Sequence, residues 1–121
     1  MKASELRIGN LISWKSTGEL DKVESITTFH ERQYVNGVNI SDCDGVALTE
    51  ERMQELGLMF DPENRMWSIC TSLGNYDFSF EIFQIPEEEY FFYKELELLY
   101  VHHLQNLFFV LTGGFELQAI E

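Results

Sequence analysis

Histidine is the residue type in this chain that most directly suggests chemistry, because its ring nitrogens bind metals and exchange protons near neutral pH. His102 and His103 are adjacent in a segment of helical periodicity, and the remaining histidine is His30. Two ligands on one helix normally lie three or four residues apart, whereas neighbouring side chains diverge by about 100°. A shared ion would need His30 or a carboxylate that is distant in sequence. The pattern therefore predicts a solvated or hydrogen-bonded polar face, with no metal ligand and no cofactor.

The two cysteines, Cys43 and Cys70, have neither metal-site nor redox-motif spacing. They could form one disulfide, but nothing in the sequence requires it, and reduced thiols are typical of a cytoplasmic protein. Cys70 follows Ile69 in a predicted strand, and this indicates a small buried apolar residue rather than a nucleophile.

Carboxylates are abundant and could in principle supply a pair for general acid–base catalysis. Glu95 and Glu97, however, lie on the polar face of a predicted strand, whereas catalytic carboxylates need burial or a close like charge. Asp42 starts a sequence like a calcium loop, but Met53 replaces the bidentate Glu of position twelve. At most a weak surface cation site remains there. The sequence predicts no catalytic residue, and an enzyme without a recognisable motif is kept as an alternative.

The charge is strongly acidic and unevenly distributed, with a formal net charge of −13 at pH 7. Residues 1–48 contain five Lys/Arg and seven Asp/Glu, which gives −2; residues 49–121 contain three and fourteen, which gives −11. Such a surface repels nucleic-acid phosphates and anionic membranes, so direct binding to either is not expected. The N-terminus lacks the apolar segment of a signal peptide and no apolar run has transmembrane length, which predicts a cytoplasmic protein.

Two helices are expected to position these residues. The clearer one covers about residues 100–111 and ends at Gly113-Gly114. Its apolar positions fall in one arc of roughly 120°. They are Tyr100, Val101, Leu104, Leu107, Phe108 and Leu111. A second helix, of two turns, is predicted over Glu50–Leu56, with Thr49 as its N-cap.

The rest of the chain is predicted to be β. Residues 1–48 have the pattern of four or five short strands, with Asn36-Gly37 as a hairpin turn, which suits either an SH3-like small barrel or a meander. Tyr76–Ile82 alternates apolar and polar residues as a half-buried strand does. Tyr90–Leu98 is expected to be another strand, with Phe92 on its inner face.

The predicted fold class is α+β: an N-terminal SH3-like small β-barrel or meander, then an antiparallel sheet packed on a C-terminal helix. Residues 1–48 form the β-rich lobe and residues 49–121 the α+β lobe, within one compact unit.

Several segments resemble a group of small uncharacterised proteins of gut bacteria, their phages and mobile elements. They are Glu5–Leu11, Leu48–Glu51, Leu56-Gly57 and Tyr100–Gly113. The resemblance spans most of the chain and is most specific in the C-terminal segment. It implies a bacterial cytoplasm and a mobile-element context, and it assigns no activity and no site.

Phe109 and Val110 lie outside the main helical arc, at roughly 80° and 180° from Val101. Either the N-terminal lobe buries them or they contact a partner. Together with Glu95 and Glu97 they form the predicted interaction surface.

The first functional hypothesis is a non-catalytic protein-interaction or accessory module with an unknown protein partner. The alternative is an acidic nucleic-acid mimic that binds a DNA-processing protein. A weak homodimer through Phe109 and Val110 is a further hypothesis.

Overall fold

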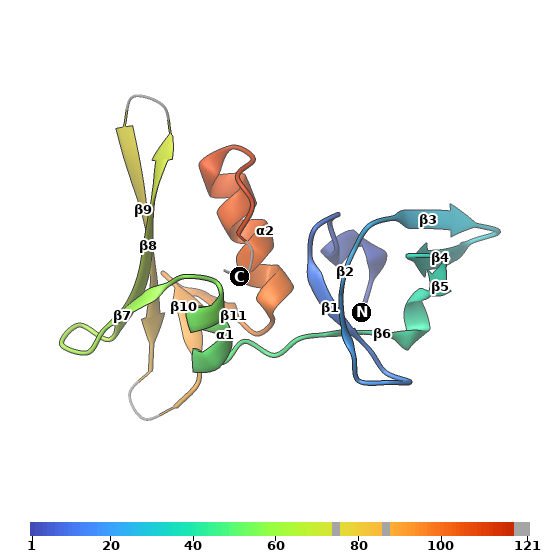
Figure 1. Ribbon diagram of the computed structural model, residues 1–121, viewed down its shortest axis with the longest axis horizontal. Helices are drawn as coiled ribbons and strands as arrows, with labels where there is room; N and C mark the ends of the chain where they lie inside the picture. Colours follow the sequence, from blue (N-terminus) through green and yellow to red (C-terminus); the bar gives the residue numbers. More distant parts are fainter. Residues whose placement is uncertain (74–75, 86–87, 118–121) are drawn as a thin grey trace. The chain divides into compact units, whose positions relative to one another are not determined.

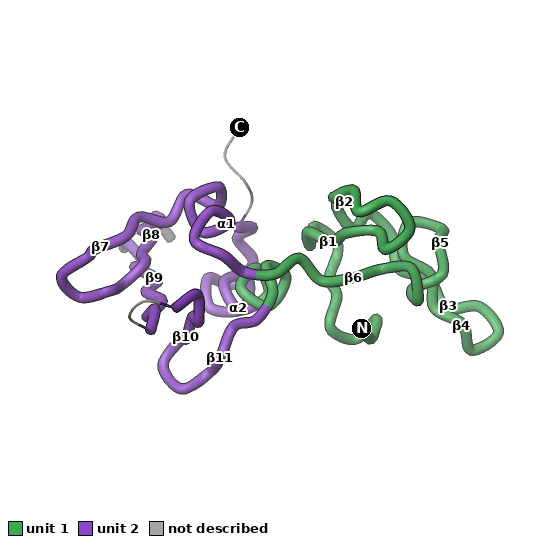
Figure 2. The backbone as a smooth tube through the Cα atoms, turned by 90° about the horizontal axis from the view of Figure 1, so that it is seen from below, with its two compact units in different colours: residues 1–47, 100–106 green, residues 48–99, 107–121 purple. Residues whose placement is uncertain are grey.

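The computed structural model describes residues 1–73, 76–85 and 88–117, and the chain divides into two compact units (Figure 2). Unit 1 contains residues 1–47 and 100–106, and unit 2 contains residues 48–99 and 107–121. Helix α2 (Val101–Thr112) therefore contributes its first half to unit 1 and its second half to unit 2. The combination of helices with antiparallel sheets confirms the α+β class.

Unit 1 contains two small antiparallel sheets (Figure 1). The first has the order β2-β1-β6 and comprises β1 (Leu11–Trp14), β2 (Leu20–Lys22) and β6 (Cys43–Gly45). The second has the order β3-β4-β5 and comprises β3 (Ile26–Phe29), β4 (Arg32–Val35) and β5 (Val38–Asn39). Two short 3₁₀ segments, η1 (Ala3–Glu5) and η2 (Ile40–Asp42), complete the unit.

Of the two alternatives predicted for residues 1–48, an SH3-like small barrel or a meander, the structure supports small antiparallel sheets. The strands of this region, all of them described, form two separate sheets and no closed barrel. Closing a sheet requires strands long enough to tilt and stagger around an axis. These strands have only two to four residues each.

The hairpin predicted at Asn36-Gly37 is confirmed. Asn36 and Gly37 have φ values of 52° and 79°, the left-handed conformation that a type I′ turn requires at both central positions. The Asn36 side chain also fixes the preceding segment. Its Oδ1 accepts hydrogen bonds from the backbone N–H groups of Glu24 at 2.7 Å and Ser25 at 3.1 Å.

The core of unit 1 is small and mostly aliphatic. One cluster of buried residues in it comprises Leu6, Ile12, Val23, Val35 and Cys43. Burying one such aliphatic side chain contributes about 1.5–3 kcal/mol.

Unit 2 contains one antiparallel meander with the strand order β11-β10-β9-β8-β7 (Figure 1). The strands are β7 (Met59–Asp61), β8 (Met66–Leu73), β9 (Tyr76–Gln84), β10 (Phe91–Tyr93) and β11 (Leu96–Leu98). The long β8–β9 hairpin is its centre, with a continuous register from Met66 opposite Phe83 to Leu73 opposite Tyr76.

The alternation predicted for β9 is confirmed from Asp77 onward. Phe80 and Ile82 are buried, whereas Ser79, Glu81 and Phe83 on the opposite face are exposed. The ring of Phe80 packs edge-to-face on Phe108 of α2, with the ring centroids 5.5 Å apart. The buried face of the sheet therefore packs on the second half of this helix, which places the core of unit 2.

Both predicted helices are confirmed, together with their end signals. Helix α1 (Glu50–Glu55) begins at Thr49, whose side chain accepts a hydrogen bond from the Arg52 N–H at 3.2 Å. Helix α2 ends at Gly113 and Gly114, with φ values of 75° and 121°. These conformations are strained for any residue with a Cβ, so the two glycines fix the end of the helix.

Candidate functional site

The exposed face of the unit 2 sheet presents a row of side chains that crosses all five strands. Residues that pair directly in an antiparallel register point to the same face. Phe83 pairs with Phe92 on one side and with Met66 on the other, and the row continues to a carboxylate at each end. We call this set the outer row. Its members, from β11 to β7, are Glu97, Phe92, Phe83, Met66 and Asp61.

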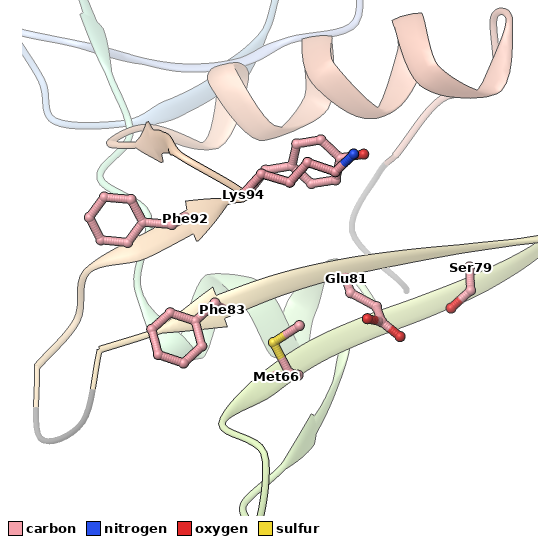
Figure 3. A pocket seen from close by; sticks show the side chains of 7 residues that line it. Met66, Ser79, Glu81, Phe83, Phe92 and Lys94 are labelled. Carbon is pink, nitrogen blue, oxygen red and sulfur yellow. The ribbon is translucent and has the colours of Figure 1, made fainter.

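A groove of about 390 Å³ adjoins the outer row and is lined by residues of β8, β9 and β10 and by Lys94 of the β10–β11 turn (Figure 3). It extends beyond the exposed face, because the ring of Tyr93 stacks on the buried ring of Phe80, with the centroids 5.3 Å apart. Its lining residues are Met66, Ser79, Glu81, Phe83, Phe92, Tyr93 and Lys94. Phe83 is 40% exposed. The Lys94 ammonium lies 5.5 Å from the ring centroid of Tyr93.

The structure corrects the expectation that Tyr90–Leu98 is one strand. Lys94 has a φ of 56°, and the chain reverses there between β10 and β11. This reversal places Phe91 in the core and Phe92 on the exposed face, the opposite of the predicted orientation. A Lys-Glu pair has no special preference for a tight turn, so no local signal in the sequence indicated the hairpin.

The four predicted interaction residues lie in two regions of unit 2, the β10–β11 hairpin and α2. Glu95 follows Lys94 in the β10–β11 turn and is exposed, and Glu97 is a member of the outer row. On α2, Phe109 is half-buried and Val110 is 74% exposed. The structure thus places Phe83, Phe92 and Met66 in one row with Glu97. Phe92 and Met66 were missed because their common face depends on the strand register.

A buried polar network lies beneath the same sheet. Gln84 accepts a hydrogen bond from Trp67 Nε1 at 2.7 Å. Its Nε2 donates to Glu50 Oε1 at 2.7 Å and to the Glu88 backbone carbonyl at 2.8 Å. The Glu50 carboxylate thus fixes α1 against β9.

Both cysteines lie in described parts of the chain, and neither forms a disulfide. Cys43 is buried, and burial raises the pKa of its thiol, which disfavours the reactive thiolate. Cys70 is exposed, so the prediction of a buried side chain there is wrong. The reason is register, because Cys70 pairs with Ser79 on the exposed face of the β8–β9 hairpin.

In unit 1, hydrogen bonds hold the N-terminal segment against the start of α2. Asn106 Nδ2 donates to the backbone carbonyl of Glu5 at 2.8 Å, and Asn10 Nδ2 donates to Asn106 Oδ1 at 2.8 Å. The backbone N–H of Leu11 donates to Gln105 Oε1 at 2.8 Å. Residues from the two ends of the sequence therefore have fixed positions next to each other.

This anchoring brings Glu5 to the adjacent histidines. Glu5, His102 and His103, which we call the histidine cluster, each offer one metal-ligating atom, and these atoms lie within 4.8 Å of one another. The two imidazole centroids are 4.5 Å apart. Adjacent histidines diverge on a helix, so their spacing alone predicts no shared ion. Glu5, which is distant in sequence, completes the cluster only in the folded chain.

His102 is the unusual member of the histidine cluster. Its side chain is buried, and neither Nδ1 nor Nε2 has a hydrogen-bond partner within the described residues. Its ring stacks on Tyr100, with the centroids 5.4 Å apart and the planes 7° from parallel. Burial, with a smaller effect of His103, lowers the pKa of His102 to about 4, so the ring is neutral at pH 7.

A cavity of about 220 Å³ adjoins the histidine cluster. It is lined by Met1, Glu5, Asp44, Gly45, Tyr100 and His102. Gly45 allows this arrangement, because a Cβ at this position would lie 2.7 Å from Cδ1 of Tyr100. The absence of a side chain at Gly45 therefore positions the aromatic ring on which His102 stacks.

Comparison of the chain with protein-family models, with curated proteins and with solved structures finds no match. Among the described residues, none of the helices has the length and apolarity needed to cross a bilayer. The functional proposals below therefore rest on the fold and on these two sites.

Proposed function

We propose that this protein is a non-catalytic interaction module of bacterial or mobile-element origin, and that it binds a protein partner through the exposed face of its five-stranded sheet. The proposal rests on one observation. The outer row places Phe92, Phe83 and Met66 side by side along a groove of about 390 Å³. The family resemblance supports the bacterial or mobile-element context.

The composition of the outer row supports binding to a protein. Single exposed apolar residues are common, whereas contiguous apolar patches on a soluble surface are typical of interaction sites. Aromatic residues and methionine are also enriched at the centres of protein interfaces.

The charges around the outer row indicate the chemistry of the partner. Glu97 and Asp61 lie at its two ends, and Glu81 lines the groove. Residues 49–121 have three basic and fourteen acidic residues, a net charge of −11. A complementary partner therefore presents an apolar side chain flanked by Lys or Arg.

A library of random peptides displayed on phage tests this proposal. The full chain should select peptides that combine aromatic or aliphatic residues with Lys or Arg, and Phe83→Ser should abolish the selection. Phe29→Ser is the matched control, because Phe29 is also an exposed phenylalanine, 65% exposed, but lies in unit 1. Selection that survives Phe83→Ser, or that shows no preference for basic residues, would contradict the proposal.

The charge of −11 on residues 49–121 also favours a second candidate, an acidic nucleic-acid mimic that binds a basic DNA-processing protein. The two candidates differ in how binding depends on salt and on Phe83. Binding by a mimic depends on many charges, so it should weaken steeply with salt and tolerate Phe83→Ser. Binding through the outer row should depend on Phe83 at every salt concentration.

A further inference from the structure

We propose that Glu5, His102 and His103 bind a divalent transition-metal ion, with Zn²⁺ as the best-matched ion. Their ligating atoms lie within 4.8 Å of one another. Two imidazole nitrogens and one carboxylate oxygen are a donor set that Zn²⁺ accepts with a fourth position open. Harder ions such as Mg²⁺ and Ca²⁺ prefer all-oxygen sites, so the two histidines favour a transition metal.

The burial of His102 is the second, independent observation. Its side chain has 1% of its surface exposed, and both ring nitrogens lack a hydrogen-bond partner in the described segments of the chain. Native structures pair nearly all buried polar atoms, and an unpaired one usually indicates an ion, a water or a functional role. A bound ion would give one of these nitrogens a partner.

The geometry requires only a modest adjustment. Ligands about 2.0–2.2 Å from a tetrahedral zinc are about 3.4 Å apart, so atoms that lie up to 4.8 Å apart in the histidine cluster must approach by up to about 1.4 Å. Glu5 can make this movement because its side chain is exposed, while Asn106 holds its backbone in place. His102 is fixed by its stacking on Tyr100, so it forms the rigid part of the site.

The adjoining cavity offers a place for the fourth ligand. Glu5 and His102 both line the cavity of about 220 Å³, and so does Asp44. A divalent ion bound to the Glu5 carboxylate leaves a net charge of +1 at the site. The Asp44 carboxylate would neutralise this charge. A water molecule in the same cavity is the alternative fourth ligand.

Isothermal titration of the full chain with ZnCl₂ tests the site. The protein is first treated with EDTA and dialysed, any polyhistidine tag is removed, and excess Mg²⁺ is present to occupy acidic surface groups. We expect one equivalent of Zn²⁺ to bind with micromolar or tighter affinity and to raise the unfolding temperature. Glu5→Gln and His103→Gln should each weaken binding by at least about tenfold, as expected when a metal site is impaired.

His30→Gln is the matched control, because it removes a histidine in the β3–β4 turn of the same unit without touching the cluster. Glu5 and His103 are changed rather than His102 because they are less buried, so these variants should stay folded. Cobalt replacing zinc should show the visible absorption of a tetrahedral ion, and His103→Gln should remove it. Binding weaker than millimolar, unchanged binding in both variants, or an equal loss in His30→Gln would overturn the proposal.

Discussion

Gln84 in unit 2 and His102 in unit 1 are equally buried, each with 1% of its surface exposed, but their surroundings differ. Gln84 bonds to Trp67, Glu50 and the backbone of Glu88. His102 has no hydrogen-bond partner among the residues that the structure places.

The difference between these two side chains distinguishes two uses of a buried polar group. Satisfied by its own chain, such a group fixes the fold, as Gln84 does between α1 and β9. Left unsatisfied, it costs stability and remains available to a ligand, as in the histidine cluster. The two candidate sites differ in the same way, because the partner is proposed to bind a row of apolar side chains in unit 2, whereas the ion is proposed to bind beside an unpaired buried histidine in unit 1.

The largest loss of stability is expected from a substitution in the apolar core of unit 2. Phe108→Ala removes the ring that packs on Phe80 and should lower the free energy of unfolding by about 3–5 kcal/mol. Urea denaturation followed by circular dichroism measures the change. A loss below about 0.5 kcal/mol would show that the sheet does not depend on α2.

Acid should affect unit 1 through His102 in the metal-free protein. The folded-state pKa of about 4 lies below the ordinary value of 6.5, so the unfolded chain takes up this proton first as the pH falls. Stability is therefore lost between pH 6.5 and 4, by about 3 kcal/mol from this residue. The lost stability is not regained below pH 4, because the residue is then protonated in both the folded and the unfolded chain.

Urea melts of wild type and His102→Phe at pH 7 and pH 4, both with EDTA, measure this effect. Phenylalanine keeps a ring against Tyr100 and cannot be protonated, so the variant should lose less stability across the interval. An identical pH dependence in the two proteins would show that His102 is hydrated or already paired.

Gln84→Leu should lower the free energy of unfolding at pH 7, whereas His102→Phe should not. Leucine leaves Trp67 Nε1 and the Glu50 carboxylate without their partner, which should cost about 1–3 kcal/mol at pH 7. His102→Phe at the same pH should be neutral or stabilising, because it removes two unpaired nitrogens. Thermal melts of both variants measure the two changes in stability. Changes of the same sign and size would contradict the contrast between Gln84 and His102.

The smallest effect concerns self-association through the helix face of unit 2. Val110 is 74% exposed beside Phe109, and pairing brings together two chains of −13, so repulsion keeps a homodimer weak and salt strengthens it. Light scattering with size exclusion should give a mass above the monomer value of 14.2 kDa at high protein concentration, increasing with salt. Val110→Ser should restore the monomer. A monomer mass for wild type under all conditions would exclude the dimer.

The sequence by itself determined the elements whose signals are local. Thr49 and Gly113 fixed helix ends because an N-cap hydroxyl and a left-handed glycine act on adjacent backbone groups. Asn36-Gly37 fixed a hairpin for the same reason. The alternation in β9 predicted its buried face because side chains alternate strictly along a strand.

Three features depend on the tertiary structure alone: the separation of the N-terminal strands into two sheets, the outer row and the histidine cluster. Short strands can pair in several ways, so their separation into two sheets depends on which edges meet. Phe92 lies on the outer face, where it is half-buried, because the chain reverses at Lys94, and the residue types there prefer no particular turn. Glu5 meets His102 because Asn106 anchors its backbone, and a contact between distant residues depends on packing that local periodicity does not encode.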